Sequence, residues 1–511
     1  MKTNIGEVLS RRAFHNPDKE ACVNSQSGLR LTFSQLNERS NRCANMLLAN
    51  GVKKGDKVAL LLMNGAEFIE SYFATAKIGA VVVPLNWRLV ADELTFILRD
   101  CGAQTVIFGG QFRDLATQLV EKGDEIGVQS WIEVCDDSSA AFAKNYAKEQ
   151  VLSSSEEPSV DSGDDDLLFI MYTSGTTGLP KGVLHSHRTA MAAMLTISAT
   201  VDARQDDIYL LALPLFHVGA LTPMCLNIYL GTTAIIMPEF NPVRAWEIIE
   251  QEKISTGLLV PAMLNFMIQV PQRGDYDHST VRWVHSGASP LPVSCIRQYA
   301  DIGIEVHQIY GLTETGGPTC VISAEHALEK AGSTGRAFFH TDVKIVDSEG
   351  LECPSGEAGE VCVRGNHIMV GYLNRPEATA EALVDGWLQT GDVATMDEQG
   401  FVYIQDRIKD MIISGGENVY PAEIENVILS HPGVADVAVI GRESERWGES
   451  PFAVVVRSSE TLTEADVLAH CDGKLARFKL PKGAAFVEVI PRNPSGKILK
   501  RVLREEFSAP L

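Results

Sequence analysis

The sequence predicts an α/β protein with a large, multi-lobed N-terminal domain and a smaller α+β C-terminal domain on a hinge. Three observations predict this fold class. The chain has 511 residues, more than one ordinary domain holds. Short apolar runs, typical of buried strands, alternate with helical patterns, which favours parallel-type sheets covered by helices. The composition is 45% hydrophobic, enough for a substantial core.

The first part of the chain already shows the alternation. Residues from Ile5 to about Leu48 are expected to be mostly helical, with a polar break at Asn24 to Gly28. Thr32, with Gln35 three residues later, fits a helix-capping box. The next expected elements are strands at Lys57 to Leu62, Ala80 to Pro84 and Thr105 to Phe108, and helices at Ala66 to Ile78 and Ala91 to Asp100.

An acidic, polar stretch from Asp136 to Asp166 separates this part from a second alternating run. The elements expected in that run are strands at Asp207 to Leu213, Thr232 to Met237, Gly257 to Val260, Arg282 to His285 and Glu305 to Ile309, and helices at Val218 to Leu230 and Val243 to Gln251. Two helix-covered sheets are therefore expected in the N-terminal domain.

Short runs with many glycines follow from Ser333 to Gly400 and predict a small β-rich lobe. Beyond it, the charged segment Gln405 to Asp410 is expected to be the hinge. We place the domain boundary so that residues 1–406 form the N-terminal domain and 407–511 the mobile C-terminal domain. Strands are expected there at Val437 to Ile440, Phe452 to Val456 and Ala485 to Ile490, with helices at Glu464 to Ala476 and after Lys497.

The bulk composition excludes several classes of function. A formal net charge of −22 argues against a nucleic acid or an anionic membrane held by bulk charge. The 10 cysteines are scattered without C-x-x-C pairs, which suits reduced thiols in the cytoplasm. The N-terminus lacks a signal-peptide core, and no uncharged apolar run reaches the ~20 residues of a membrane span.

A hydroxyl- and glycine-rich loop follows the apolar run Leu167 to Met171 and precedes a helical pattern near His185. Such a loop can converge backbone N–H groups, hydroxyls and a lysine on phosphate oxygens. It differs from a Walker P-loop because Gly182 follows the lysine. The residues expected to bind phosphate are Thr173, Ser174, Gly175, Thr176, Thr177, Gly178 and Lys181.

A second cluster, Tyr310 to Gly316, directly follows the strand Glu305 to Ile309. Ligands of parallel sheets bind past the carboxyl ends of strands. Tyr310 could stack on a nucleobase, Thr313 could bond a phosphate oxygen, and Glu314 could hold Mg²⁺. The alternative is a loop with a satisfied, buried glutamate.

Three further residues are ambiguous when each is considered alone. Asp392 could accept both hydroxyls of a ribose, but an aspartate in a turn is more often only a turn residue. Lys497 lies in a Pro-x-Gly-Lys context, although a lone lysine near a C-terminus is usually a solvated charge. His217 lies between a strand end and an apolar helix, where a satisfied structural histidine is the alternative.

Taken together and in this order, these motifs resemble the adenylate-forming superfamily of acyl-CoA synthetases, peptide-synthetase adenylation domains and luciferases, over essentially the whole chain. The resemblance implies ATP, Mg²⁺ and coenzyme A as cofactors and substrates. It implies catalytic roles for Lys497, Glu314, Thr313 and His217, and metal binding by Glu314 and Thr176. It also implies cofactor binding by Gly287, Ala288, Tyr310, Gly311, Asp392, Arg407, Gly415, Gly416 and Trp447.

The resemblance is strongest to fatty-acid and aryl-acid CoA ligases. Adenylation domains of peptide synthetases usually carry an aspartate that meets an amino group, and the stretches Val218 to Leu221 and Val260 to Met263 have no such acid. The acid is expected to contact His217, Val218, Gly219, Leu221, Gly316 and Gly317. We favour a medium-to-long fatty acid, with a benzoate- or cinnamate-type acid as the alternative.

Two rivals from other classes stay open: a luciferase-type oxygenase and a non-catalytic nucleotide-binding module. The expected partners are small molecules only, namely the carboxylic acid, ATP and CoA, with no nucleic acid and no integral membrane segment. A homodimer, common among members of the superfamily, is also possible.

Overall fold

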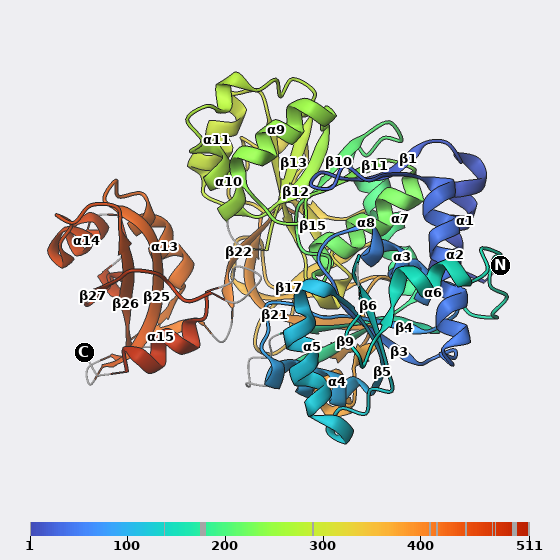
Figure 1. Cartoon of the computed structure of the whole chain (residues 1–511). Coiled ribbons are helices and arrows are strands. Elements are labelled where there is room, and N and C mark those ends of the chain that lie inside the picture. Colours follow the sequence, from blue (N-terminus) through green and yellow to red (C-terminus); the bar gives the residue numbers. More distant parts are fainter. Residues whose placement is uncertain are drawn as a thin grey trace.

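The structure is a computed structural model. It describes residues 2–136, 138–173, 180–288, 291–407, 410–414, 417–444, 447–472, 474–475, 477–492 and 498–508, with the backbone alone at 124, 407, 417, 418 and 478. Most of the chain forms a large body built on two sheets, and the C-terminal elements stand beside it (Figure 1).

Sheet A has 9 strands in the order β16-β15-β14-β13-β12-β10-β11-β1-β2. Its central strands, from β14 to β1, pair in parallel, as the alternation of strand and helix predicts. The strands are β1 (Glu20–Asn24), β2 (Arg30–Thr32), β10 (Ile208–Leu211), β11 (Thr233–Ile236), β12 (Thr256–Leu259), β13 (Trp283–Ser286), β14 (Glu305–Tyr310), β15 (Cys320–Val321) and β16 (Arg336–Ala337).

Sheet B has 8 strands in the order β19-β9-β8-β4-β3-β5-β6-β7, also with a parallel centre. The strands are β3 (Lys57–Leu61), β4 (Val81–Pro84), β5 (Ala103–Gly109), β6 (Ser130–Val134), β7 (Lys144–Asn145), β8 (Leu167–Thr173), β9 (Lys181–Ser186) and β19 (Gly371–Tyr372).

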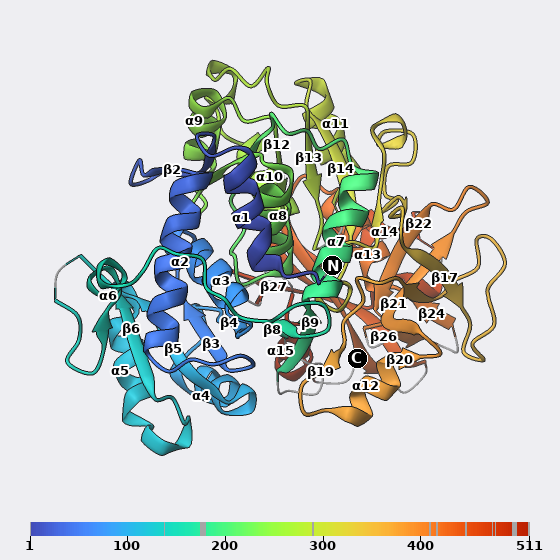
Figure 2. The same ribbon diagram turned by 90° about the vertical axis from the view of Figure 1, so that its right-hand side faces the viewer.

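Helices fill the space between the two sheets and cover both outer faces. The inner layer joins strands of both sheets to α1, α2, α3 and α8 in one apolar core. On the outer faces, α9 to α11 cover sheet A and α4 and α5 cover sheet B, at the top and bottom of Figures 1 and 2. The bounds are α1 (Ile5–His15), α2 (Phe33–Ala49), α3 (Ala66–Lys77), α4 (Ala91–Cys101), α5 (Arg113–Glu121), α6 (Tyr146–Leu152), α7 (His187–Thr200), α8 (Val218–Leu230), α9 (Pro242–Glu252), α10 (Pro261–Ile268) and α11 (Val293–Asp301).

A small antiparallel sheet, sheet C, forms the β-rich lobe that the glycine-rich stretch predicts. It holds β17 (Asp342–Val346), β18 (Gly359–Arg364), β20 (Leu383–Val384), β21 (Trp387–Met396) and β22 (Val402–Arg407), with α12 (Pro376–Ala382) beside it.

The C-terminal elements form sheet D, which has a separate helix layer on each face. In β25, Val437 and Val439 face α13 and α14, while Ala438 and Ile440 face α15, because side chains alternate along a strand. The elements are β23 (Ile412–Ser414), β24 (Glu417–Val419), α13 (Pro421–Leu429), β25 (Val434–Ser444), β26 (Gly448–Arg457), α14 (Glu464–Cys471), β27 (Ala484–Val487) and α15 (Lys500–Glu506).

Two local expectations are wrong. The stretch from Ile5 to Leu48 is not helical around its polar break, because β1 and β2 form a hairpin there and β1 pairs with β11 at the edge of sheet A. The phosphate loop does not lead directly into a helix either, since β8 and β9 pair antiparallel with Thr173 opposite Lys181. The capping box of Thr32 and Gln35 is confirmed at the start of α2.

A buried lysine ties the inner helices to the acidic stretch. The Lys77 side chain is 2% exposed, and its Nζ donates to Ser10, Asn37, Asn41 and Glu157, all within 3.0 Å. Burial lowers the Lys77 pKa, while Glu157 opposes that shift. The cation is therefore held by its partners rather than by water.

Replacing Lys77 by methionine is expected to destabilise the protein by about 2–3 kcal/mol, because buried acceptors lose their donor and Glu157 loses its counter-charge. The readout is thermal or urea unfolding. Lys122→Met removes an exposed ion pair with Asp92 and serves as the matched control, with no measurable change expected. Equal effects of the two substitutions would contradict this account of Lys77.

Candidate active site

The carboxyl ends of the central strands of sheet A carry the Tyr310 to Gly316 cluster, as the sequence predicts. Glu314 lies in a short 3₁₀ turn, Thr313–Thr315, just after β14. Its Oε1 accepts a hydrogen bond of 2.8 Å from the Tyr372 hydroxyl, and its carbonyl accepts one of 2.8 Å from the Met369 amide. Burial raises the Tyr372 pKa, so this phenol remains a donor.

The predicted phosphate-loop lysine lies near the ring of the tyrosine that bonds this carboxylate. The Lys181 Nζ sits 5.1 Å from the centroid of the Tyr372 ring, within the range of a cation–π contact. Tyr372 belongs to β19, which pairs with β9, the strand that Lys181 begins. Sequence reasoning missed Tyr372, because a lone tyrosine far from the motifs carries no signal of its own.

Two buried histidines hold the Glu314 turn. The His185 Nε2 lies 2.8 Å from the Thr313 carbonyl oxygen, and the His367 Nδ1 lies 2.8 Å from the Thr315 carbonyl oxygen. Burial lowers the His185 pKa to about 4, so its neutral ring donates from Nε2. The backbone of Thr313 is therefore held in place, and its side-chain hydroxyl takes no part in this hydrogen bond.

Asp392 and Tyr310 come together from two sheets. The Tyr310 hydroxyl donates to Asp392 Oδ2 at 2.7 Å, and Asp392 is 4% exposed. Burial, followed by the Asp392 charge, raises the Tyr310 pKa. Asp392 in β21 stands directly opposite Arg407 in β22, as a ribose-binding pair would require. The Arg407 side chain lies outside the described residues.

The backbone is tightly constrained at the ends of β13 and β14. Ala288, exposed after β13, has φ +70°, a left-handed conformation that is uncommon for a residue with a Cβ. A Cβ at Gly287 would lie 2.5 Å from the Ile309 carbonyl oxygen, and one at Gly311 would lie 1.5 Å from that of Gly317. Glycine is thus required at both positions, and these backbones form the rim beside Tyr310.

His217 caps the start of α8 without a side-chain capping bond, and its Nε2 is buried. Within the described parts of the chain this nitrogen has no hydrogen-bond partner. Burial and the Arg88 charge lower the His217 pKa to about 4. An unpartnered, neutral imidazole nitrogen can meet a polar group of a ligand.

The other predicted acid-binding residues surround the start of α8. Val218 and Gly219 are partly exposed, and a Cβ at Gly317 would lie 3.8 Å from Val218. The Thr222 hydroxyl donates to the Gly316 carbonyl at 2.7 Å and so joins α8 to the Glu314 turn. Leu221 is 1% exposed and packs in the inner core.

Several predicted site residues lie outside the described residues: Ser174, Gly175, Thr176, Thr177, Gly178, Gly415, Gly416 and Lys497. The neighbours of the C-terminal ones are described. Ser414 of β23 pairs with Gly448, the first residue of β26, and Trp447, which precedes that strand, is 43% exposed. Arg492 and Ile498 form an antiparallel bridge on either side of Lys497.

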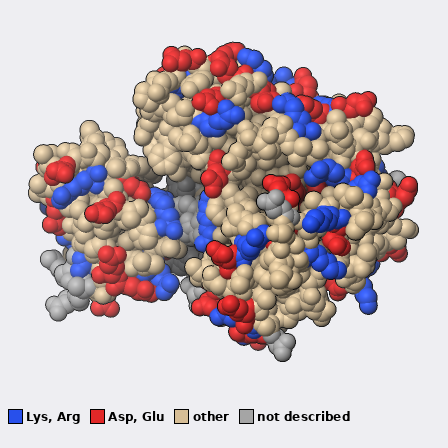
Figure 3. Space-filling view, viewed as in Figure 1, with Lys and Arg blue, Asp and Glu red and all other residues tan. Residues whose placement is uncertain are grey.

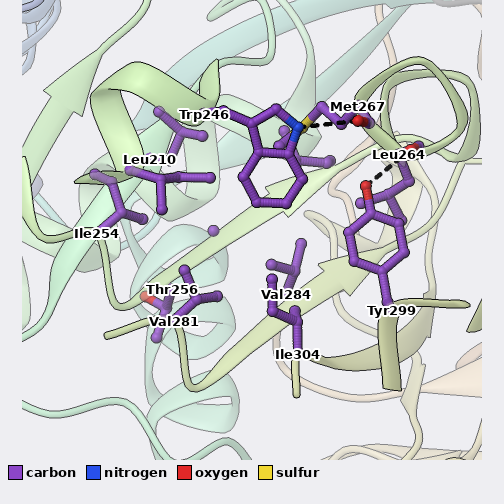
Figure 4. Close-up of a pocket in the computed structure, with 13 residues that line it drawn as sticks. Leu210, Trp246, Ile254, Thr256, Leu264, Met267, Val281, Val284, Tyr299 and Ile304 are labelled. Carbon is purple, nitrogen blue, oxygen red and sulfur yellow. Dashed lines mark hydrogen bonds between the residues drawn. The ribbon is translucent and has the colours of Figure 1, made fainter. Parts of the chain in front are cut away.

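An apolar cavity of about 20 Å³ lies on the outer face of sheet A, away from these residues (Figure 4). Trp246 and Tyr299 line it and donate hydrogen bonds to the Met267 and Leu264 carbonyls of α10. Its volume is close to that of a single water, and its lining is apolar, so we interpret it as a packing defect.

A carboxylate such as that of Glu314 suits magnesium, which prefers oxygen ligands. In the described parts of the chain, no group of three or more His, Cys, Asp or Glu side chains could hold a metal ion. Magnesium bound with substrate phosphates needs only one or two carboxylates. Over the same residues, no helix is both long and apolar enough to cross a bilayer. Acidic and basic side chains are interspersed on the face shown in Figure 3.

Comparisons with known proteins give matches over most of the chain. The family model described as AMP-binding enzyme matches residues 9–373, and that of the AMP-binding enzyme C-terminal domain matches residues 423–497. The chain is 46% identical over 507 residues to the long-chain-fatty-acid–CoA ligase FadD13 of Mycobacterium tuberculosis (strain ATCC 25618 / H37Rv), covering 99% of each chain.

Two further matches are a relative that is named for an aryl acid and a solved structure. A feruloyl-CoA synthase from Amycolatopsis sp is 38% identical, covering 98% of this chain and 99% of the relative. The solved Mycobacterium tuberculosis fatty acyl CoA synthetase matches with a TM-score of 0.80 and 44% identity, covering 99% of this chain and 98% of that one.

Proposed function

The chain belongs to the AMP-binding enzyme family, and we propose that it is an acyl-CoA synthetase that activates a medium-to-long-chain fatty acid with ATP and transfers it to coenzyme A. The observation that carries this proposal is the group formed by Lys181, Tyr372 and Glu314 beside the Tyr310–Asp392 pair. It combines a cation, a carboxylate suited to a metal ion and a pair suited to a nucleoside where sheets A, B and C meet, past the carboxyl end of β14.

In the first half-reaction, a carboxylate oxygen of the acid attacks the α-phosphorus of ATP. The bond to the β-phosphate oxygen breaks, giving acyl-AMP and pyrophosphate. Lys181 and the preceding loop hold the leaving phosphates, and Asp392 accepts the ribose hydroxyls. Lys497 neutralises the charge that develops between the carboxylate and the α-phosphate. Glu314, with Thr176, would hold Mg²⁺, which supplies positive charge at the phosphate oxygens when bound.

The acid is held at the start of α8. The neutral His217 ring donates to the substrate carboxylate through its buried, unpartnered Nε2. Val218 and Gly219 contact the first carbons of the acyl chain. Gly317 leaves room opposite Val218, since it carries no side chain, whereas Gly316 faces His185 and Ala193 and holds the backbone of the turn.

In the second half-reaction, the CoA thiolate attacks the acyl carbonyl carbon, and AMP leaves with the electron pair of the C–O bond. We propose that the C-terminal domain, residues 407–511, turns about Asp406 to Lys409 between the two steps. Lys497 then leaves, and Gly415, Gly416 and Trp447 arrive to line the path of the pantetheine arm. Asp406 supports this role, because its Oδ2 accepts a hydrogen bond from the Ala422 amide of α13.

The test is pyrophosphate release with a series of acids, followed by detection of the acyl-CoA. Saturated fatty acids of medium and long chain are expected to give kcat/KM at least about ten-fold above benzoate and cinnamate. A preference for benzoate or cinnamate would replace the proposal by an aryl-acid ligase. ATP binding without pyrophosphate release from any acid would favour a non-catalytic module, and oxygen-dependent light from a supplied acyl-adenylate would favour a luciferase-type enzyme.

The proposal also covers the cellular location and the oligomeric state of the enzyme. ATP and CoA are cytoplasmic substrates, and we place the enzyme in the cytoplasm. A homodimer is the proposed assembly, and light scattering of the purified protein tests it through the molar mass, with 55.6 kDa expected for a monomer.

A further inference from the structure

Two histidines lie side by side on the inner face of sheet A. They stand on neighbouring strands, on the N-terminal side of the proposed carboxylate site. His285 in β13 is the direct neighbour of His307 in β14, and Leu258 of β12 is the direct neighbour of His285. The two ring centroids are 5.9 Å apart. Both histidines are 7% exposed.

This row faces the same side as the acid-binding residues. Leu258 packs against the inner core, together with Val218 and Val260. The alternate residue Val284 points the opposite way, into the core beneath α9 to α11. The imidazoles therefore project toward the α8 side of the sheet, where the acyl chain is proposed to enter.

The hydrogen-bonding capacity of this pair is largely unused. The His307 Nε2 lies 3.0 Å from Glu305 Oε2. A neutral His307 donates that proton, so its Nδ1 carries a lone pair. In the described residues, neither nitrogen of His285 has a hydrogen-bond partner; its ring contacts are aromatic, with Trp283 and His307.

Both imidazoles are neutral at physiological pH. Burial lowers the His285 pKa to about 3, with His307 adding to the shift, and burial also lowers the His307 pKa against the opposing Glu305 charge. A neutral pair without a full set of partners offers one donor and two acceptors in an otherwise apolar row. These nitrogens are not fully enclosed, so a hydroxyl can reach them, and in place of mobile water it would supply a donor and an acceptor fixed in position.

The distance along the strand locates the group that would bind. His285 lies two residues before Gly287, whose backbone packs against Ile309 at the ends of β13 and β14, and we place the carboxylate of the acid at this level of the sheet. Two residues of strand span about 7 Å. A hydroxyl at that distance from the carboxyl carbon would reach both rings.

We propose that His285 and His307 bind a hydroxyl group of the acid about 7 Å from its carboxylate, which makes hydroxylated acids the preferred substrate class. The hydroxyl donates to the His307 Nδ1 and accepts from a nitrogen of His285. This inference rests on the proposed acyl-CoA synthetase function. The hydroxyl could belong to an aliphatic chain or to an aromatic ring, and the two are separated below.

The experiment measures kcat/KM for pyrophosphate release with matched acids. The aliphatic set is octanoate, 6-hydroxyoctanoate and, as positional control, 3-hydroxyoctanoate; the aryl pair is cinnamate and 4-hydroxycinnamate. For one acid with its hydroxyl at the predicted position, kcat/KM is expected to exceed that of the unsubstituted acid by at least about ten-fold. The 3-hydroxy acid is expected to show no such gain, and whichever pair shows the gain identifies the source of the hydroxyl.

Substitutions then assign the preference to these two rings. His285→Leu and His307→Leu are expected to bring the ratio of hydroxylated to plain acid to about one, while kcat/KM for the plain acid changes by less than about three-fold. His285→Gln keeps a donor and an acceptor and is expected to retain part of the preference. His15→Leu, at an exposed histidine in α1, is the matched control, and thermal unfolding verifies that each variant is folded.

The outcomes separate this inference from the function on which it rests. A wild-type enzyme that activates plain acids without preferring the hydroxylated ones overturns the inference and leaves the proposed function intact. An unchanged ratio in folded His285→Leu and His307→Leu variants overturns it as well. Absence of pyrophosphate release with every acid would overturn both.

Discussion

Replacing Lys497 by alanine is expected to lower the rate of acyl-adenylate formation by about 10²–10³-fold, because one preorganised charge at a developing anion contributes that much. Thioester formation from supplied acyl-AMP is expected to change by less than about ten-fold, since the proposed domain rotation has removed Lys497 from the site by then. The two half-reactions are measured separately, by pyrophosphate release and by acyl-CoA formation in single turnover.

The matched control is Lys500→Ala, three residues further along the same segment. Lys500 is buried in an ion pair of 2.9 Å with Glu425 at the start of α15. Its loss is expected to lower stability and to affect both half-reactions alike. Equal loss of both half-reactions in Lys497→Ala would remove the assignment of Lys497 to adenylation.

Replacing Glu314 by glutamine is expected to lower adenylation by about 10²–10³-fold and to raise the Mg²⁺ concentration needed for half-maximal rate, because the substitution removes the carboxylate charge at the proposed metal site but keeps its shape. Tyr372→Phe removes only the hydrogen bond to Glu314 Oε1 and is expected to cost about ten-fold or less. A magnesium titration of pyrophosphate release is the measurement.

Glu357→Gln, an exposed glutamate in the β-rich lobe, controls for the general loss of negative charge. Excess Mg²⁺ is expected to restore the rate of pyrophosphate release more fully in Tyr372→Phe than in Glu314→Gln. Unchanged magnesium dependence in Glu314→Gln would assign the metal to another side chain.

Fold class was predictable because strand–helix alternation is a property of short sequence windows. The parallel centres of sheets A and B follow from that alternation, and the Thr32–Gln35 capping box follows from two residues three apart. The hairpin of β1 and β2 was missed because β1, a five-residue strand next to the edge strand β2, is stabilised by β11, more than two hundred residues away. Local periodicity carries no information about such a partner.

The site was predictable where motifs follow strand ends, and unpredictable where tertiary contacts complete it. Glu314 and Asp392 stand in recognisable motifs, whereas Tyr372 enters only because β19 pairs with β9. His185 and His367 likewise support the Glu314 turn from distant segments. The antiparallel pairing of β8 with β9 was missed for the same reason. The helical pattern after the phosphate loop belongs to α7, and the strand β9 lies between the loop and that helix.

The distance between the two domains in each half-reaction tests the central claim most directly. Spin labels at Val384→Cys and Val489→Cys, both exposed positions, report it by pulsed electron resonance, with Cys135 and Cys353, the two native cysteines that are not buried, replaced by serine. The distance distribution with ATP and a fatty acid is expected to differ from that with an acyl-adenylate analogue and CoA. One unchanged distribution in both states would contradict the account.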